Sequence, residues 1–173
     1  MKKIVNLVLV LLMFGSGTLS IHADEEKNID LLGIISVSDL KNSSHFTWYE
    51  ENELSYNVDE GALADIDRLL EGVEIKVVMG TWCHDSKREV PRFYKILSHK
   101  TDNIEMIALD RKKQSPNGET DAMAITNTPT FIFYKNGKEM NRIVETPVDS
   151  LERDMIKILS GKEYRHSKMP AND

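Results

Sequence analysis

The stretch "GTWCHDSKREVPRFYKIL", residues 80–97, contains Cys83, the only cysteine in the 173-residue sequence. The preceding residues 73–79, "VEIKVVM", are rich in β-branched side chains, which predicts a buried strand. Apolar residues then recur at helical spacing, which predicts a helix that begins near Asp85. The helical pattern is carried by Val90, Phe93, Tyr94 and Leu97. A strand, a cysteine-bearing loop and a helix therefore follow one another directly.

On both sides of this stretch, helical and strand patterns alternate. Helices are expected from residue 60 to Gly72, from 85 to 97, from 119 to 125 and from Asp149 or Ser150 to Gly161, and strands at 73–79, 104–109, 130–134 and 139–144. Asn136–Gly137 predicts a hairpin turn between the last two strands, because Asn and Gly tolerate positive φ. Strands separated by helices imply parallel crossovers, and the hairpin adds an antiparallel edge. The fold class is therefore α/β, with a central mixed sheet of about four strands and helices on both faces.

The pattern divides the chain into four parts. Residues 1–23 are interpreted as a signal peptide, 24–58 as an N-terminal extension packed on the domain, 59–162 as the domain, and 163–173 as a flexible tail. The extension has mixed signals, and the segment from Ile29 to Val37 fits either a short strand or an early helix.

Residues 1–23 have the pattern of an export signal. Lys2 and Lys3 precede an apolar run from Ile4 to Phe14, and a small, polar segment leads to a cleavage site at Ala23. The rival interpretation is a membrane anchor, but the apolar run falls well short of the roughly 20 residues that span a bilayer. We therefore expect cleavage, export to the periplasm or envelope of a bacterium, and no stable membrane span afterwards.

Charge and cysteine content narrow the range of functions. The formal net charge is −6, and it becomes about −8 without the two lysines of residues 1–23. An acidic chain is a poor partner for nucleic acid. A single cysteine excludes an internal disulfide, and an unpaired cysteine in an exported protein is either reactive or pairs with another molecule.

Four features in this order resemble the thioredoxin superfamily. Trp82-Cys83-x-x-Ser86 follows a strand and opens a helix, Pro91 follows in that helix, and Thr128-Pro129 begins the third strand. The segment "TPTFIFYKNGKE", residues 128–139, resembles the strand and hairpin that follow the family's cis-proline. The stretch 80–97 is also similar to exported thioredoxin-like proteins of the Bacteroidetes group. The resemblance covers residues 60–160 and implies a thioredoxin-like fold, with a cis peptide bond before Pro129.

Two departures from the family pattern agree with each other. Ser86 replaces the second, resolving cysteine, and Val77 occupies the position of a buried acid that the family uses to transfer a proton to the resolving thiol. Both losses affect attack by a second sulfur. They predict a monothiol site instead of a dithiol site.

The resemblance and the local chemistry together give each residue a role. Cys83, at a helix N-terminus, is the expected nucleophile, and Ser86 is expected to donate a hydrogen bond to its thiolate. His84 either tunes the thiol, acts as a general acid or is a surface histidine without a role. In this fold, Trp82, Thr128 and Pro129 line the substrate surface, where the backbone of Thr128 pairs with a substrate peptide. The scattered histidines show no metal-ligand spacing, so neither a metal nor a cofactor is expected.

A monothiol can start thiol–disulfide exchange but cannot finish it alone. The first hypothesis is therefore a monothiol exchange protein of the cell envelope, whose mixed disulfides an external thiol resolves. Its partners would be cysteine-containing proteins or low-molecular-weight thiols, and a dithiol oxidoreductase is a third candidate partner. The second hypothesis is a non-catalytic binding module that uses the same surface. Peroxide sensing by Cys83 is a weaker third, because no resolving cysteine is present.

Overall fold

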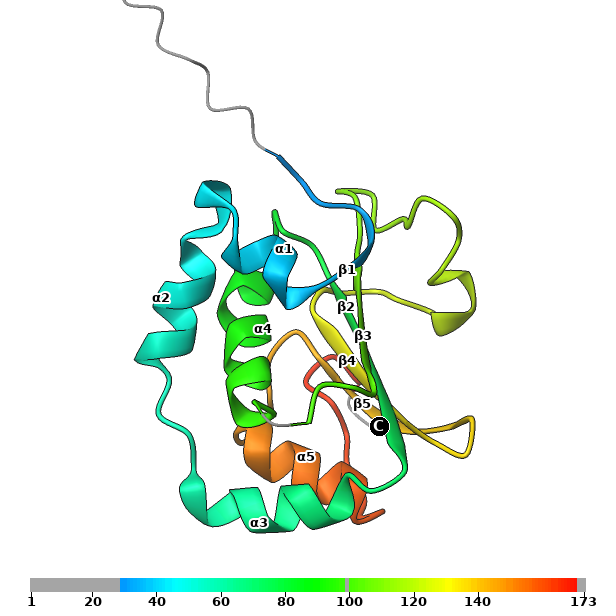
Figure 1. The fold of residues 1–173 in the computed structure, drawn as a ribbon. Helices are drawn as coiled ribbons and strands as arrows, with labels where there is room; N and C mark the ends of the chain where they lie inside the picture. The colour runs from blue at the N-terminus through cyan, green and yellow to red at the C-terminus, as the bar shows by residue number, and fades with distance from the viewer. Residues whose placement is uncertain (1–28, 99, 171–173) are drawn as a thin grey trace, which may run out of the picture.

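The computed structural model describes residues 29–98 and 100–170, so the predicted signal peptide lies outside the described residues. A five-stranded sheet has the order β1-β3-β2-β4-β5 (Figure 1). The strands are β1 (Gly33–Ile35), β2 (Val73–Met79), β3 (Ile104–Ala108), β4 (Thr130–Lys135) and β5 (Lys138–Val144). β2 and β3 are parallel, and the other neighbouring pairs are antiparallel. The expected mixed sheet and its β4–β5 hairpin are confirmed.

The sheet has one strand more than expected, and that strand comes from the N-terminal extension. β1 pairs antiparallel with β3, with Gly33 opposite Ala108 and Ile35 opposite Met106. Of the two structures that remained open for this segment, the strand is the one observed. Three residues are too few to show the alternation by which strands are recognised.

Within residues 29–98 and 100–170, five α-helices accompany the sheet: α1 (Val37–Lys41), α2 (Trp48–Ser55), α3 (Glu60–Leu69), α4 (His84–Ile96) and α5 (Leu151–Leu159). There are also two 3-10 helices, η1 (Ser44–Phe46) and η2 (Asp121–Met123). Ser150 caps α5 by accepting a hydrogen bond from the Arg153 N–H. Over the residues that the structure describes, no helix combines the length and the hydrophobicity of a membrane span.

The α-helices gather on one face of the sheet (Figure 1). Each of them contributes a buried side chain to the larger core cluster: Leu40, Tyr49, Ala62, Phe93 and Met155 are examples, in chain order. A smaller cluster on the other face contains Val78, Ile107, Leu109 and Ile132, and Met123 and Ile125 of the loop after β3 pack against it. In the described part of the chain, this second face therefore carries no α-helix: the 3-10 helix that contains Met123 and the loop around it cover the face.

The segment between β3 and β4 also differs from its prediction. Only η2 forms where a helix over 119–125 was expected, and Ala124, directly after η2, has φ +50°, a left-handed conformation that ends a helix. β4 begins beside the C-terminal end of β2, since Thr130 lies opposite Val78. The chain therefore returns antiparallel through a loop, and no parallel helical crossover is needed.

The first part of the predicted flexible tail packs on the domain. Tyr164 is buried, and its hydroxyl donates to the Asp154 carboxylate at 2.9 Å. The Ser167 hydroxyl donates to the Val144 carbonyl oxygen at 2.7 Å. The prediction of a flexible tail from residue 163 is therefore corrected for these residues. A single buried aromatic residue anchors a segment that is otherwise polar in sequence.

Candidate functional site

Cys83 lies where β2 gives way to α4. β2 ends at Met79, and a short turn is closed by the Cys83 N–H, which donates to the Gly80 carbonyl oxygen at 2.9 Å. Cys83 is the N-cap residue of α4, with φ −83° and ψ 127°, and its side chain is half-buried. The free N–H groups at a helix N-terminus stabilise negative charge. The predicted nucleophile is therefore reachable and lies at the start of a helix.

The thiol faces the loop before β4. The Cys83 Sγ lies 3.1 Å from the carbonyl oxygen of Thr128, to which its S–H donates. The Thr128–Pro129 peptide bond is cis, and both residues are buried. The Thr130 hydroxyl donates to the Asn127 carbonyl oxygen at 2.7 Å, which closes the loop. The structure thus brings together Cys83, Thr128 and Pro129 as the sequence predicted.

Trp82 directly precedes Cys83 in the chain, and two contacts hold its side chain. Its Nε1–H donates to the Leu109 carbonyl oxygen at 2.9 Å, and the Arg111 guanidinium lies 6.0 Å from the ring centroid. A Cβ on Gly80 would lie 2.5 Å from the indole ring. Position 80 therefore accepts only glycine while Trp82 keeps this orientation.

The N-terminal extension reaches the same loop. The Leu31 N–H donates to the Thr81 hydroxyl at 3.1 Å, and Asp30 pairs with Arg111 at 3.0 Å. Arg111 in turn lies over Trp82. Residues before the first strand therefore contribute to the position of the tryptophan. No spacing in the sequence connected them with the site.

Ser86 does not have the partner that was predicted. Its side chain is fully buried, and its hydroxyl accepts a hydrogen bond from the Gly80 N–H at 3.2 Å. Among the described residues, no hydrogen bond joins Ser86 to Cys83. The predicted contact with the sulfur is corrected to a structural contact, because the turn before Cys83 presents a buried N–H that needs an acceptor.

The other predicted residues are placed but not given a chemical task. His84 is exposed at the first position of α4, and its tuning role stays a prediction. Val77 is fully buried in β2, opposite Met106 and Phe131. A carboxylate does lie on α4, where Glu89 is 4% exposed and accepts from the Arg88 guanidinium at 2.6 Å. The Glu89 carboxylate is therefore already engaged in an ion pair with Arg88.

Three residues near Thr128 were missed by the sequence analysis. The Asn127 amide donates to the Glu145 carboxylate at 2.6 Å, and Lys168 pairs with the same carboxylate at 2.5 Å. Burial opposes the ionisation of Glu145, but hydrogen bonds from Lys168 and Asn127 outweigh it and hold the pKa of this carboxyl below its ordinary value. These residues are far apart in the chain, so no motif indicated them.

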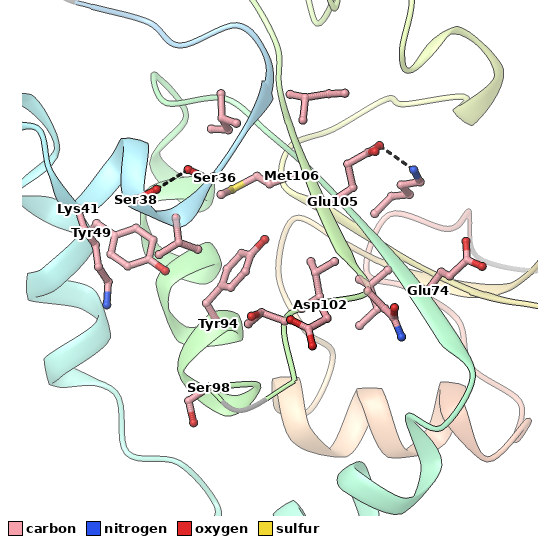
Figure 2. Close-up of a pocket in the computed structure, with 18 of the residues that line it drawn as sticks. Ser36, Ser38, Lys41, Tyr49, Glu74, Tyr94, Ser98, Asp102, Glu105 and Met106 are labelled. Carbon is pink, nitrogen blue, oxygen red and sulfur yellow. Dashed lines mark hydrogen bonds and ion pairs between the residues drawn. The ribbon is translucent and has the colours of Figure 1, made fainter.

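A cavity of about 820 Å³ lies elsewhere, beside the N-terminal halves of β2 and β3 (Figure 2). Tyr49, Tyr94, Glu74 and Met106 are among its lining residues, and none of the lining residues comes from 79–86 or 127–129. The cavity is therefore separate from the thiol. Over the described residues, no cluster of His, Cys, Asp and Glu side chains could hold a metal ion.

The comparisons with known proteins agree with the fold. Residues 73–157 match the family model described as Thioredoxin. A protein of unknown function from Pseudomonas aeruginosa has 13% identity and a TM-score of 0.58, with 75% of this chain and 93% of that chain covered. An HIV epitope-scaffold has 14% identity and a TM-score of 0.51, with 75% and 84% covered. These two likenesses show the fold alone.

Schistosoma mansoni thioredoxin has 32% identity over 46% of this chain and 74% of its own, with a TM-score of 0.33. No curated protein matches the sequence. The family model covers β2, α4 and β3 to β5, and thus both Cys83 and Thr128. Residues 73–157 thus resemble the thioredoxin family in sequence, and the chain has a thioredoxin-like fold.

Proposed function

We propose that this protein is a monothiol thiol–disulfide exchange protein, in which Cys83 forms mixed disulfides that an external thiol resolves. The observation that carries the proposal is the contact between the half-buried Cys83 thiol and the Thr128 carbonyl oxygen at 3.1 Å. This pair lies at a helix N-terminus, next to Trp82. The thioredoxin family match supports an oxidoreductase-like role of this kind.

The absence of a second cysteine from the sequence determines how the mixed disulfide is resolved. The Cys83 thiolate attacks one sulfur of a disulfide R–S–S–R′, so that a Cys83–S–S–R bond forms and R′–S⁻ leaves. An external thiolate R″–S⁻ then attacks the R sulfur, which releases the Cys83 thiolate and forms R–S–S–R″. At the end of the two steps the protein is neither oxidised nor reduced, because the free Cys83 thiolate is restored. Because Cys83 is the only cysteine in the sequence, the protein cannot store a disulfide within its own chain.

The proposal includes a place and partners. The basic, apolar and small-residue order of residues 1–23 supports export to the envelope or periplasm of a bacterium. The partners would be cysteine-containing proteins or low-molecular-weight thiols, with a dithiol oxidoreductase as a further candidate for resolution. Nucleic acid is not proposed, because the chain is acidic. Export predicts a mature protein that begins at Asp24, which intact-mass measurement of the purified envelope form would show.

The experiment traps the mixed disulfides in the producing cell. Cells are quenched with acid, free thiols are alkylated, and complexes of the protein are separated without reductant. The proposal expects complexes that disappear on reduction and in Cys83→Ser, but persist in Ser86→Ala, whose hydroxyl contacts Gly80 and not the sulfur. If the same complexes form in Cys83→Ser, the proposal is wrong.

One observation favours the second candidate, a binding module. The Ser86 hydroxyl contacts the Gly80 N–H and not the sulfur, so the hydrogen bond that was expected to support a Cys83 thiolate is not formed among the described residues. A binding module would form complexes that survive both reduction and Cys83→Ser. These would depend on the surface around Trp82, so that Trp82→Ala would abolish them.

A further inference from the structure

The loop that carries Thr128 is connected to the C-terminal segment through Glu145. One carboxylate oxygen of Glu145 accepts from the Asn127 amide at 2.6 Å, and the other lies 2.5 Å from the Lys168 ammonium. Asn127 directly precedes Thr128, whose carbonyl oxygen accepts from the Cys83 thiol. A continuous series of contacts thus runs from Lys168 through Glu145 to Asn127. Asn127 is joined by its peptide bond to Thr128, which accepts from the Cys83 thiol.

The backbone of Glu145 takes part in the same connection. Its N–H donates to the Pro129 carbonyl oxygen at 2.8 Å. Glu145 has φ +61°, a left-handed conformation that is unfavourable for any residue with a Cβ. Such a conformation persists where the surrounding contacts hold it, and it is concentrated at functional sites. Here two contacts hold Glu145 in this conformation: its N–H donates to the Pro129 carbonyl oxygen, and its carboxylate accepts from the Asn127 amide.

Independent contacts fix the C-terminal segment that provides Lys168. The Ser167 hydroxyl lies 2.7 Å from the Val144 carbonyl oxygen and 3.2 Å from that of Thr146, the two residues that flank Glu145. Tyr164 is buried, and its hydroxyl donates to the Asp154 carboxylate. The ammonium of Lys168 is therefore held beside Glu145 by the packing of its own segment.

An ordinary surface ion pair is the competing explanation, because exposed pairs contribute little to stability. The Lys168 side chain is 45% exposed and that of Glu145 is 21% exposed. The pair between Lys76 and Glu105 is similar, with a distance of 2.6 Å and exposed fractions of 29% and 38%. However, that pair joins neighbouring strands away from the thiol, whereas Glu145 also binds the residue next to Thr128. The Lys76–Glu105 pair therefore provides a matched control.

We propose that Glu145 is a positioning residue of the thiol site: through Asn127 it holds the Thr128 carbonyl against Cys83, and Lys168 holds Glu145. The C-terminal segment is thereby part of the site. This inference rests on the proposed function for the role of Cys83 as the reacting thiol, but the geometry that it concerns can be measured without any exchange reaction.

The test uses the fact that Cys83 is the only cysteine of the chain. Its S–H stretching band in the infrared spectrum is therefore a single band, and a hydrogen bond to a carbonyl lowers its frequency. The full chain is measured in acidic buffer, where the thiol keeps its proton, with circular dichroism to confirm folding. We expect a lowered band in the wild type, a shift toward the free-thiol frequency in Glu145→Ala, Asn127→Ala and Lys168→Ala, and no shift in Glu105→Ala.

Glu145→Gln provides the rescue. Its amide oxygen can still accept from Asn127, so its band should lie nearer to that of the wild type than the band of Glu145→Ala. Formation of a mixed disulfide with glutathione disulfide should become about 2- to 10-fold faster in Glu145→Ala, since the attacking sulfur must first leave its hydrogen bond to the Thr128 carbonyl oxygen. The rate in Glu105→Ala should be unchanged.

A wild-type band at the free-thiol frequency, or an unmoved band in Glu145→Ala, overturns the inference. An unmoved band in Lys168→Ala overturns the part assigned to the C-terminal segment, and a failure of Glu145→Gln to restore the band overturns the step through Asn127. If the bands move as expected but the wild type never forms a mixed disulfide, the positioning holds and the proposed function fails. If exchange proceeds but the bands do not move, the proposed function holds and the positioning role of Glu145 fails.

Discussion

The Cys83 Sγ lies 3.1 Å from the Thr128 carbonyl oxygen, although 45 residues separate the two in the chain. In this contact the S–H is the donor and the carbonyl oxygen is the acceptor. An extended substrate peptide would need the same oxygen to accept one of its N–H groups. Docking of such a peptide is therefore expected to displace the thiol from this oxygen.

The first prediction concerns Ser86, whose hydroxyl accepts from the Gly80 N–H at 3.2 Å. Ser86→Ala leaves this buried N–H without a partner, and we expect it to lower the free energy of unfolding by about 1–3 kcal/mol. Denaturant titration measures this change. The exposed Ser55, whose hydroxyl donates to the Asn52 carbonyl oxygen, provides the control, and Ser55→Ala should change stability by no more than about 0.5 kcal/mol. A Ser86→Ala variant as stable as Ser55→Ala would contradict the assigned contact.

The second prediction concerns Gly80, where a Cβ would lie 2.5 Å from the Trp82 ring. Gly80→Ala must displace the indole and break its hydrogen bond to the Leu109 carbonyl oxygen. We expect a loss of about 1–3 kcal/mol, which is typical of overpacking, with a change in tryptophan fluorescence. In a Trp82→Ala background the same substitution should cost much less. Equal costs in the two backgrounds, measured as a double-mutant cycle, would show that the two residues do not compete for space.

The third prediction concerns Tyr164, whose hydroxyl donates to the fully buried Asp154 carboxylate. Because a hydrogen bond to a charged group is involved, we expect Tyr164→Phe to lower the unfolding free energy by about 1.5–3 kcal/mol at neutral pH. Tyr134, for which the described residues provide no hydrogen-bond partner, is the control. Tyr134→Phe should have little effect. A similar, small loss in both variants would mean that the C-terminal segment is not anchored through Asp154.

Tyr164 also affects stability in alkaline solution. Burial and, after it, the negative charge of Asp154 raise the pKa of the Tyr164 hydroxyl. The folded state therefore holds this proton more tightly than the unfolded state does. The resulting stabilisation is fully present below the unfolded tyrosine pKa of about 10 and is lost as the pH rises above it. Wild-type stability should thus fall more steeply above that pH than the stability of Tyr164→Phe.

The fourth prediction concerns Tyr49, which lines the cavity of Figure 2. The side chain is fully buried, and its hydroxyl finds no hydrogen-bond partner among the described residues. An unpaired buried hydroxyl is destabilising, so Tyr49→Phe should raise the unfolding free energy by about 1 kcal/mol. Tyr94→Phe, at the same cavity, should be close to neutral. A destabilised Tyr49→Phe would reveal a bound partner for the hydroxyl.

The sequence predicted the centre of this molecule better than its periphery. β2 was expected at its observed bounds, because four of its seven residues have β-branched side chains, which favour a strand. The meeting of Cys83 with Thr128 was expected only through the resemblance to thioredoxins. By contrast, nothing in a three-residue strand or a single tyrosine near the C-terminus signals long-range packing. β1 and Tyr164 depend on partners far away in the chain.

The direction of a polar side chain was the hardest feature to predict. Ser86 stands one helical turn from Cys83, so a contact with the sulfur was reasonable from spacing alone. In the structure, the backbone N–H of Gly80 takes the hydroxyl, because a buried N–H requires an acceptor. Glu145 was missed for a related reason: its partners Asn127 and Lys168 meet it only after the sheet has formed.

The central claim is that Cys83 exchanges with disulfides and depends on an external thiol for release. The most direct measurement follows the intact mass of the protein in excess glutathione disulfide, then after addition of reduced glutathione. We predict that one glutathione is added to the wild type and none to Cys83→Ser, and that the adduct is stable until the thiol is supplied. Ser86→Cys, which supplies a second sulfur, should release the glutathione without it. A wild type that gains no glutathione, or that reacts no faster than a free cysteine peptide at the same pH, would contradict the claim.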